Sequence, residues 1–189
     1  MPRTQTDARS RILEVADALF YREGVRAVGV DTIIAEADVA KTTLYRYFPS
    51  KDDLVVAYLE ERSQRFWQLF ETVVVAPYSD QPRQQLFALL GWLDELLAQP
   101  EIHGCPFLIT ASEFPDTHYP GHQVALTYKQ TLRDRITALA EQANLQPAPE
   151  LSAALMMLID GAFAQRRLFQ THPNGITLVQ AAQRLIAAY

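Results

Sequence analysis

Side chains that donate hydrogen bonds or carry positive charge are concentrated in one short stretch of this sequence, residues 41–51. The donor-bearing residues there are Lys41, Thr42, Thr43, Tyr45, Arg46, Tyr47 and Lys51. No Asp or Glu occurs between residues 39 and 51. Ammonium and guanidinium groups neutralise phosphates, and hydroxyl and guanidinium groups bond to base edges. This combination predicts a local site that binds duplex nucleic acid.

Hydrophobic spacing around this stretch predicts two short helices joined by a tight turn. Ile33, Ile34 and Ala37 give the first helix an apolar face. Leu44 and Phe48 are four residues apart and anchor the second helix. This arrangement is a helix-turn-helix, and it leaves the donor-bearing face of the second helix free to enter a major groove.

The run ADVAKTTLYRYFPSK, residues 37–51, followed by Leu54, resembles the recognition segment of the TetR family of bacterial transcriptional regulators. The resemblance is specific over residues 9–62 and fades beyond them. It implies an all-α fold with an N-terminal three-helix DNA-binding domain. It also implies a C-terminal helical domain that binds an effector and forms a dimer.

Two positions depart from the family pattern, in which a glycine and a serine are usual. Asp38 stands at the turn in place of glycine, and Asp tolerates a left-handed backbone, so we expect the turn to form. Ala40 stands in place of serine and has no side-chain oxygen. The second helix is therefore expected to begin without a side-chain cap.

The charge of the chain argues against a generally basic DNA-binding surface. The net charge of the 189 residues is −5, and residues 1–62 hold 9 Lys and Arg against 11 Asp and Glu. Positive charge is therefore local to the second helix. No apolar run approaches the roughly 18–20 residues that span a bilayer, so a cytoplasmic protein without membrane contact is expected. The single cysteine, Cys105, excludes an internal disulfide and a CxxC motif.

About nine helices account for the periodicity of the whole chain. After the helix-turn-helix, Ser50 is an expected N-cap with Asp53 three residues later. Besides the two short helices, helical spacing predicts helices over residues 9–22, 51–75, 81–99, 105–113, 122–144, 149–170 and 174–188. Residues 6–66 are expected to form the DNA-binding domain and residues 67–189 the effector-binding and dimerisation domain. The helix over 51–75 holds no Gly or Pro, so the two domains should be rigidly coupled.

The resemblance implies a mostly apolar cavity for a small-molecule effector in the second half. Aromatic, sulfur-containing and buried polar residues suit its lining. The candidates are Phe66, Phe70, Phe107, His122, Tyr128, Met156 and Asp160. For any single one of them, a plain core position is favoured over contact with an effector. Asp160 lies within the apolar run LMMLIDGAFA, so its carboxylate should need a partner.

The last two helices are the expected dimer surface, because they carry many apolar residues and little charge. The candidates are Leu151, Leu155, Leu158, Ala162, Val179, Ala182, Leu185 and Ile186. The resemblance implies a four-helix bundle with two helices from each subunit. One recognition helix reads too few base pairs to be selective, so a two-fold partner is expected.

These observations favour a homodimeric, ligand-responsive transcriptional regulator, usually a repressor in this family, that binds a palindromic duplex DNA operator. Lys41 and Lys51 would neutralise phosphates, Thr42 and Thr43 would reach base edges, and the two tyrosines would contact phosphate or a thymine methyl. Arg3 and Arg9 form either a short basic arm or part of a frayed terminus.

Other functions remain open at this level. A protein of the same fold could bind DNA without any effector. An enzyme built on Cys105, His118 and Asp116 would lack an oxyanion loop and a nucleophile elbow. The four histidines contain no HExxH motif, and His118 and His122 flank Pro120 and Gly121, where a helix is not expected. No metal and no cofactor is therefore predicted.

Overall fold

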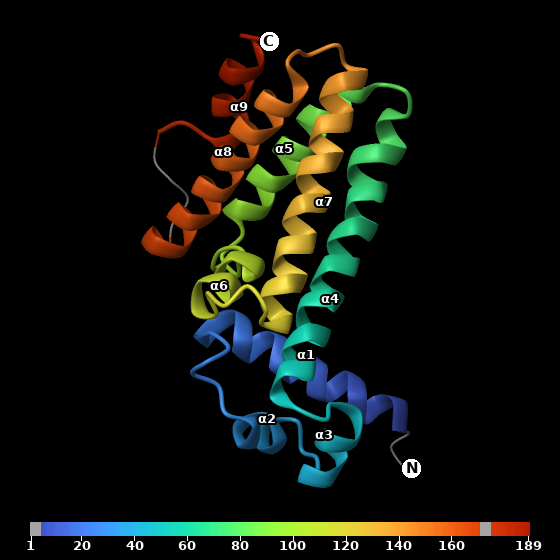
Figure 1. Ribbon diagram of the computed structural model, residues 1–189, viewed down its shortest axis with the longest axis vertical. Helices are drawn as coiled ribbons and strands as arrows, with labels where there is room; N and C mark the ends of the chain where they lie inside the picture. The colour runs from blue at the N-terminus through green and yellow to red at the C-terminus, as the bar shows by residue number, and fades with distance from the viewer. Residues whose placement is uncertain (1–4, 171–174) are drawn as a thin grey trace. The chain divides into compact units, whose positions relative to one another are not determined.

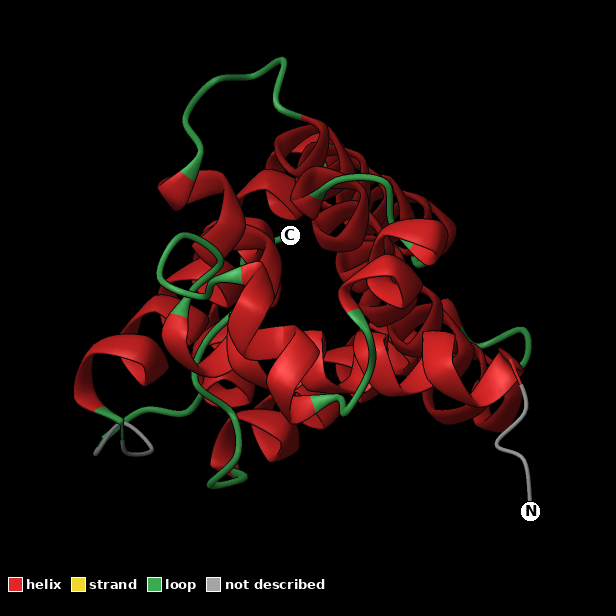
Figure 2. Cartoon of the chain, turned by 90° about the horizontal axis from the view of Figure 1, so that it is seen from below, coloured by secondary structure: helices red, strands yellow, loops and turns green. Residues whose placement is uncertain are grey.

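The computed structural model describes residues 5–170 and 175–189 of the chain. Within these ranges the regular secondary structure is entirely helical, as the red helices and green loops of Figure 2 show. Figure 1 follows the helices in chain order. They are α1 (Gln5–Glu23), α2 (Val30–Glu36), α3 (Lys41–Tyr47), α4 (Lys51–Phe70), the π-helical turn η1 (Glu71–Val75), the 3₁₀ turn η2 (Ala76–Tyr78), α5 (Pro82–Ala98), α6 (Pro106–Glu113), α7 (Pro120–Gln142), α8 (Ala148–Phe169) and α9 (Leu178–Ile186). The all-α prediction is confirmed.

Three helix starts differ from those predicted. α1 begins at Gln5 instead of residue 9. α7 begins at Pro120, so the expectation that Pro120 and Gly121 exclude a helix is wrong. Proline is tolerated there because the first helical residue donates no intrahelical hydrogen bond. α9 begins at Leu178, where a capping box forms: the Thr177 hydroxyl accepts from the Gln180 N–H, and the Gln180 side chain accepts from the Thr177 N–H, both at 3.2 Å. This Thr-x-x-Gln spacing is visible in the sequence.

The chain packs into two compact units whose boundaries lie inside α4 and α7. Unit 1 comprises Met1–Ser63 and Pro106–Thr127, and unit 2 comprises Gln64–Cys105 and Tyr128–Tyr189. A single boundary between residues 66 and 67 does not describe these two units, because α6 lies later in the sequence and yet belongs to unit 1. The functional boundaries of the two domains stay a prediction.

The core of unit 1 forms where α1 supports the two short helices. Its apolar side chains, at most 4% exposed, include Ile12, Leu13, Ala16, Leu19, Phe20, Ile33, Leu44, Phe48, Leu54 and Tyr58. The Phe20 and Tyr58 rings meet edge to face at 5.6 Å between centroids. The expected cap at Ser50 is present: its hydroxyl accepts from the Asp53 N–H at 3.1 Å and donates to the Asp53 carboxylate at 2.6 Å.

An ion pair joins α1 to α4 within this unit. The Arg62 guanidinium donates to both carboxylate oxygens of Asp17, at 2.6 and 3.0 Å. The same guanidinium lies 4.0 Å from the Tyr21 ring centroid and 5.3 Å from that of Tyr58. Two directed hydrogen bonds and two ring faces fix the orientation of this arginine, so the middle of α4 is held in a defined position on α1.

α6 ends against the loop that follows α1. The Glu113 carboxylate accepts a hydrogen bond from the Arg26 N–H at 2.8 Å. Gly24 in the same loop has a φ of +93°, and a Cβ atom placed there would lie 2.2 Å from Glu113 Oε1. The loop therefore needs glycine at this position for two reasons, its left-handed backbone and the approach of the carboxylate.

The segment between α6 and α7 continues this contact. The Arg26 guanidinium lies 4.9 Å from the Phe114 ring centroid, and the Phe114 ring stacks on Tyr119 at 4.0 Å. The Tyr119 hydroxyl donates to the Asp52 carboxylate at the start of α4, at 3.0 Å. Residues 113–119 thus connect the loop after α1 with the first turn of α4.

Unit 2 is built from packed contacts among α5, α8 and α9, with η1 against α5. Leucine residues of α5 and α8 supply much of its core: Leu86, Leu89, Leu90, Leu151 and Leu155 are fully buried. The helix predicted over 51–75 ends its α-helical part at Phe70 and continues as η1. Among the helices in the described ranges, none is both long and apolar enough to cross a membrane.

Candidate nucleic-acid interface

The turn between α2 and α3 has the predicted geometry. Asp38 adopts a left-handed backbone with a φ of +50°, as expected of the residue that replaces glycine. Ala40 is the N-cap of α3 and makes no side-chain cap bond, which confirms the second expectation. Ile33 and Leu44 are fully buried, so both short helices are held by their apolar sides.

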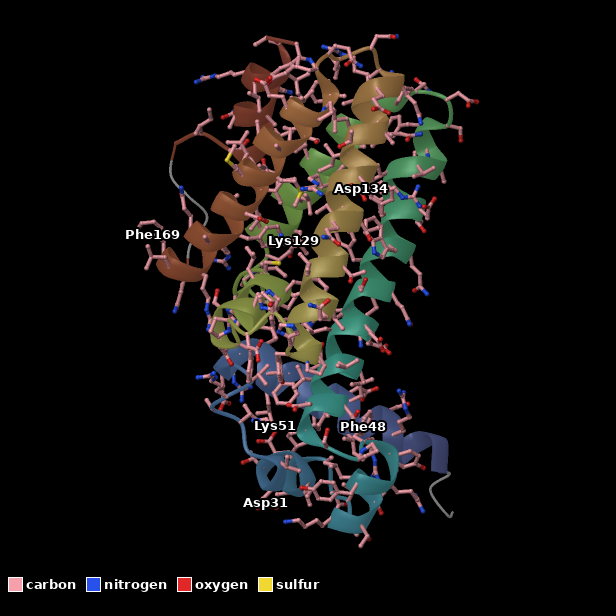
Figure 3. All side chains as sticks on the ribbon, viewed as in Figure 1. Asp31, Phe48, Lys51, Lys129, Asp134 and Phe169 are labelled. Carbon is pink, nitrogen blue, oxygen red and sulfur yellow. The ribbon has the colours of Figure 1, made fainter. Side chains whose placement is uncertain are left out.

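The opposite side of α3 carries the donors. Lys41, Thr42, Tyr45 and Arg46 are exposed, whereas Thr43 and Tyr47 are half-buried. Phe48 lies in the core just beyond the helix and is labelled in Figure 3. A helix anchored by its buried face and bearing lysine, threonine, tyrosine and arginine on the other has the form of a helix that enters a major groove.

The cations around α3 have different surroundings. Lys41 Nζ donates to Asp31 Oδ1 at 3.1 Å. The Arg46 guanidinium lies 5.0 Å from the Tyr47 ring centroid. Lys51 is half-buried, with its Nζ 6.0 Å from the Phe20 ring centroid.

Burial shapes the electrostatics of Lys51. Desolvation lowers the pKa of its ammonium group, and the charges of Glu113 and Asp52 only partly oppose this effect. The guanidinium of Arg9 lies 5.4 Å from the Phe48 ring centroid, so this residue of the suggested basic arm lies near the same helix. Arg3 falls outside the described residues.

Comparisons with known proteins agree with this geometry. The sequence model of a family described as bacterial regulatory proteins, tetR family, matches residues 12–58. The crystal structure of SCO4454, a TetR-family transcriptional regulator from Streptomyces coelicolor, has a TM-score of 0.86 and 30% sequence identity, and the match covers 97% of this chain and 96% of that one. The chain belongs to the TetR family. Its curated homologues are named as transcriptional regulators, a non-enzymatic class.

Similar TetR-family proteins include repressors named KstR. The one from Mycolicibacterium smegmatis is 34% identical over 93 residues, which are 49% of this chain and 45% of that protein. The one from Rhodococcus jostii is 44% identical over 61 residues, 32% of this chain and 29% of that protein. The chain thus spans less than half the length of these curated relatives. A structure of a TetR-type regulator from Streptomyces avermitilis matches with a TM-score of 0.85 at 30% identity, covering 96% of this chain and 97% of that one.

The predicted effector residues of this TetR-family chain fall into both units. Phe107 and His122 belong to unit 1, where Phe107 is buried and His122 Nδ1 lies 2.8 Å from the Phe114 carbonyl oxygen. The remaining five, Phe66, Phe70, Tyr128, Met156 and Asp160, belong to unit 2.

Three of the five form part of an aromatic cluster. Ring centroids of Phe66 lie 5.0 Å from Trp92, 5.3 Å from Tyr128 and 6.5 Å from Phe70. Trp67 completes the cluster, 5.1 Å from Phe66. Neither tryptophan was among the predicted lining residues, although both belong to the aromatic-rich sequence around them.

Asp160 has the partner that its apolar surroundings required. Its carboxylate accepts from the ammonium group of Lys129 on α7, and both side chains are largely buried. Tyr128, adjacent in sequence to this lysine, is buried, and desolvation raises its pKa well above the usual value, with smaller effects from Cys105 and Asp160. Met156 is half-buried on α8. The sequence required a partner for Asp160 but did not identify Lys129.

Four of the eight residues predicted for the dimer surface are buried inside the single chain, which corrects that part of the prediction. Leu151, Leu155, Ala182 and Ile186 are at most 1% exposed within the single chain. They pack in the core of unit 2, because α8 and α9 must bury one face against α5 before they can offer another. Val179 and Leu185 are half-buried. These two and the pair Leu158 and Ala162 are the predicted residues that keep some exposure.

The exposed apolar residues near α8 and α9 are partly different from those predicted. They are Met157, Leu168, Phe169 and Ile176. Met157 and Ile176 line a surface pocket together with Leu158 and Ala162, between α5, α8 and the start of α9. Phe169, at the end of α8, is labelled in Figure 3.

The groups considered for other chemistry are divided between the two units. Cys105 is buried in unit 2. His118 Nδ1 lies 3.3 Å from Asp116 Oδ1 on an exposed segment of unit 1. Across the described parts of the chain, no group of three or more His, Cys, Asp or Glu side chains could hold a metal ion. His172 lies outside the described residues.

Proposed function

We propose that this protein is a homodimeric transcriptional repressor that binds a palindromic DNA operator and is released from it by a small-molecule effector. The observation that carries the proposal is the α3 helix, anchored by buried Leu44 and presenting Lys41, Thr42 and Arg46 to solvent. Membership of the TetR family and the similar repressors support it. A chromosomal operator would place the protein in the bacterial cytoplasm.

The DNA contacts follow from the side chains that α3 presents. Thr42, Thr43 and Arg46 are the candidates for bonds to base edges, and Tyr45 and Tyr47 for phosphate or thymine methyl contacts. Lys41 and Lys51 are the candidates for phosphates. Lys51 is half-buried, so it would serve a phosphate that approaches the start of α4 closely.

Effector binding is proposed at the aromatic cluster of unit 2, formed by Phe66, Trp67, Phe70, Trp92 and Tyr128. α4 begins at Lys51, directly after the helix-turn-helix formed by α2 and α3, and ends at Phe70, inside this cluster. An effector that rearranged these rings would act on the far end of the helix whose start adjoins the DNA site. The resulting tilt of α4 would change the separation of the two recognition helices in a dimer.

The test is a selection of bound sequences from random duplex DNA by the purified protein. We expect a palindromic motif whose half-sites are about one helical turn, roughly 34–36 Å, apart. A motif without two-fold symmetry would contradict the dimeric mode of binding. Failure to enrich any sequence would contradict the function as a whole. Small apolar molecules would then be screened for release of the selected duplex.

A second candidate function is a DNA-binding protein of the same fold that responds to no effector. The packing of the aromatic cluster favours it, because ring centroids only 5.0–6.5 Å apart are in mutual contact. An effector would have to displace some of these rings. Substituting Phe66 with alanine separates the two candidates: altered effector response with intact DNA binding supports the first.

A further inference from the structure

An ion pair links the reader helix α3 to the helix before it. Lys41 Nζ lies 3.1 Å from Asp31 Oδ1, and the two side chains are 62% and 84% exposed. Lys41 is the first residue of α3, and Asp31 lies in the first turn of α2, where Figure 3 labels it. The hydrogen bond and the charge of Asp31 raise the pKa of Lys41. The lysine is therefore charged, and its charge is matched by a carboxylate of its own chain.

The other two reader cations are placed differently. Lys51 packs beside Phe20, and the Arg46 guanidinium lies over the ring of Tyr47. In the part of the chain that the structure describes, Lys41 is the one of the three with a carboxylate in ion-pair contact. Asp31 thus acts on the most accessible ammonium group of the reader.

The energetics of this pair argue for a role in binding and against a role in folding. Exposed ion pairs contribute little to stability, because solvent screens them and two long side chains must be ordered. Binding to non-operator duplex, by contrast, depends almost wholly on cations that neutralise phosphates. A carboxylate that already matches Lys41 removes one such cation from encounters with non-operator DNA.

Operator binding differs because α3 is then docked in the groove. There Lys41 would meet a phosphate or the O6 and N7 acceptors of a guanine at close range, and a directed acceptor can replace the exposed carboxylate. The free-energy cost of breaking the ion pair is therefore offset at the operator and not on other duplexes.

We propose that Asp31 is a specificity-determining residue of the DNA interface. Its carboxylate holds Lys41 closed on duplexes that lack the operator, and docking of α3 in the operator groove transfers Lys41 to a DNA acceptor. This inference rests on the proposed function. It predicts that the loss of the carboxylate improves binding to the wrong DNA more than to the right DNA.

The experiment compares Asp31→Asn with a matched control, Glu36→Gln. Glu36 is an exposed acid on the same helix, about 140° around it from Asp31, and forms no ion pair among the described residues. Both substitutions remove one negative charge. Binding is measured over a series of salt concentrations on a random-sequence duplex and on the selected operator.

Asp31→Asn should tighten binding to the random duplex about threefold and steepen its salt dependence by about 0.9 in the log–log slope, as expected for one additional phosphate contact. Operator affinity should change less, so the ratio of the two affinities falls. Glu36→Gln should leave that ratio unchanged. In a Lys41→Ala background, Asp31→Asn should no longer affect the ratio.

Two results would overturn the inference. One is an equal effect of the two acid substitutions on the ratio, and the other is an effect of Asp31→Asn that persists without Lys41, since either would make Asp31 a source of general charge only. A DNA-free measurement separates this failure from that of the proposed function. By NMR, the pKa of Lys41 should fall toward its ordinary value of 10.5 in Asp31→Asn and not in Glu36→Gln. If the pKa falls as expected but no duplex is bound, the proposed function itself fails, and the role in specificity fails with it.

Discussion

Thr42 and Thr43 occupy the start of α3, yet they differ in what they can reach. Thr42 is exposed and Thr43 is half-buried against the helix-turn-helix core. Hydroxyl groups at the N-terminal end of a recognition helix are close to base edges when the helix lies in the groove. Of the two candidates for base contacts, Thr42 therefore has the more accessible hydroxyl.

Thr42→Ala should relax selectivity at one or two operator positions, with a loss of about 1–3 kcal/mol of discrimination there, because a base contact is removed. The measurement is a repeated selection with the variant. Thr72→Ala is the control, since this threonine belongs to η1 of unit 2 and its exposed hydroxyl donates to the Gln68 carbonyl oxygen. An unchanged motif with Thr42→Ala would mean that the reading face of α3 is assigned incorrectly.

The Lys129 and Asp160 pair has a different energetic character from an exposed ion pair. The two side chains are 16% and 33% exposed, so little solvent screens them. Asp160→Asn should lower the free energy of unfolding by about 1–3 kcal/mol, because the ammonium group of Lys129 keeps its charge without its carboxylate.

A matched control for this substitution is available on α7. Asp134 is exposed and only 4.0 Å from Arg133, and Figure 3 labels it further along the same helix. Asp134→Asn should change stability by well under 1 kcal/mol. Urea unfolding of both variants, with Lys129→Met and the double variant Lys129→Met with Asp160→Asn, measures the coupling. Additive effects of the two single changes would show that the pair contributes nothing specific.

At the scale of elements, α6 shows how one helix from the middle of the sequence becomes part of the N-terminal unit. Its last residue, Glu113, bonds to the N–H of Arg26 in the loop after α1. The contact depends on a loop residue without a side chain, Gly24. The helix end and the glycine loop therefore constrain each other.

Gly24→Ala should destabilise the protein by about 1–3 kcal/mol, because alanine is strained at a φ of +93° and its Cβ would meet the Glu113 carboxylate at 2.2 Å. Gly91→Ala provides the contrast: it lies inside α5, with no atom within 4 Å of an added Cβ. This change should raise stability by roughly 0.5–1 kcal/mol. Chemical unfolding midpoints test both, and a neutral Gly24→Ala would remove the proposed constraint on the loop.

At the scale of the whole molecule, α8 and its surroundings leave an apolar surface exposed to solvent. Met157 is 70% exposed, and it adjoins a pocket lined by Leu158, Ala162 and Ile176. Exposure of such an apolar patch to water is unfavourable, and a partner that covers the patch removes this cost. A second copy of the chain is the proposed partner, since a palindromic operator needs two recognition helices.

Met157→Glu should leave the single chain folded, because the residue is already exposed, and should make the protein monomeric by placing a carboxylate in an apolar interface. Operator affinity should fall strongly, while binding to an isolated half-site changes little. Leu69→Glu is the control, as Leu69 is an exposed leucine on α4 and not on the proposed surface. Sedimentation gives the mass, and a Met157→Glu variant that stays dimeric would place the dimer contact elsewhere.

The sequence by itself determined the features that depend on a few neighbouring residues. The helix-turn-helix, the left-handed Asp38, the uncapped Ala40 and the cap at Ser50 all follow from local spacing and backbone preference. The donor-bearing face of α3 follows as well, because Leu44 and Phe48 fix which side of a short helix is buried. Helical periodicity along the rest of the chain predicted the all-α fold as well.

Only the tertiary structure decided which buried faces meet. An apolar stripe on a helix indicates that this face is buried, but it does not identify the partner that buries it. For this reason the sequence assigned to a dimer surface four residues that pack within the chain: Leu151, Leu155, Ala182 and Ile186. The placement of residues 106–127 with unit 1 has the same origin. The partners of charged groups were equally hidden: Lys41 meets Asp31 ten residues away, and Lys129 meets Asp160 across 31 residues. Such pairs are set by the packing of whole helices, which no local pattern of residues encodes.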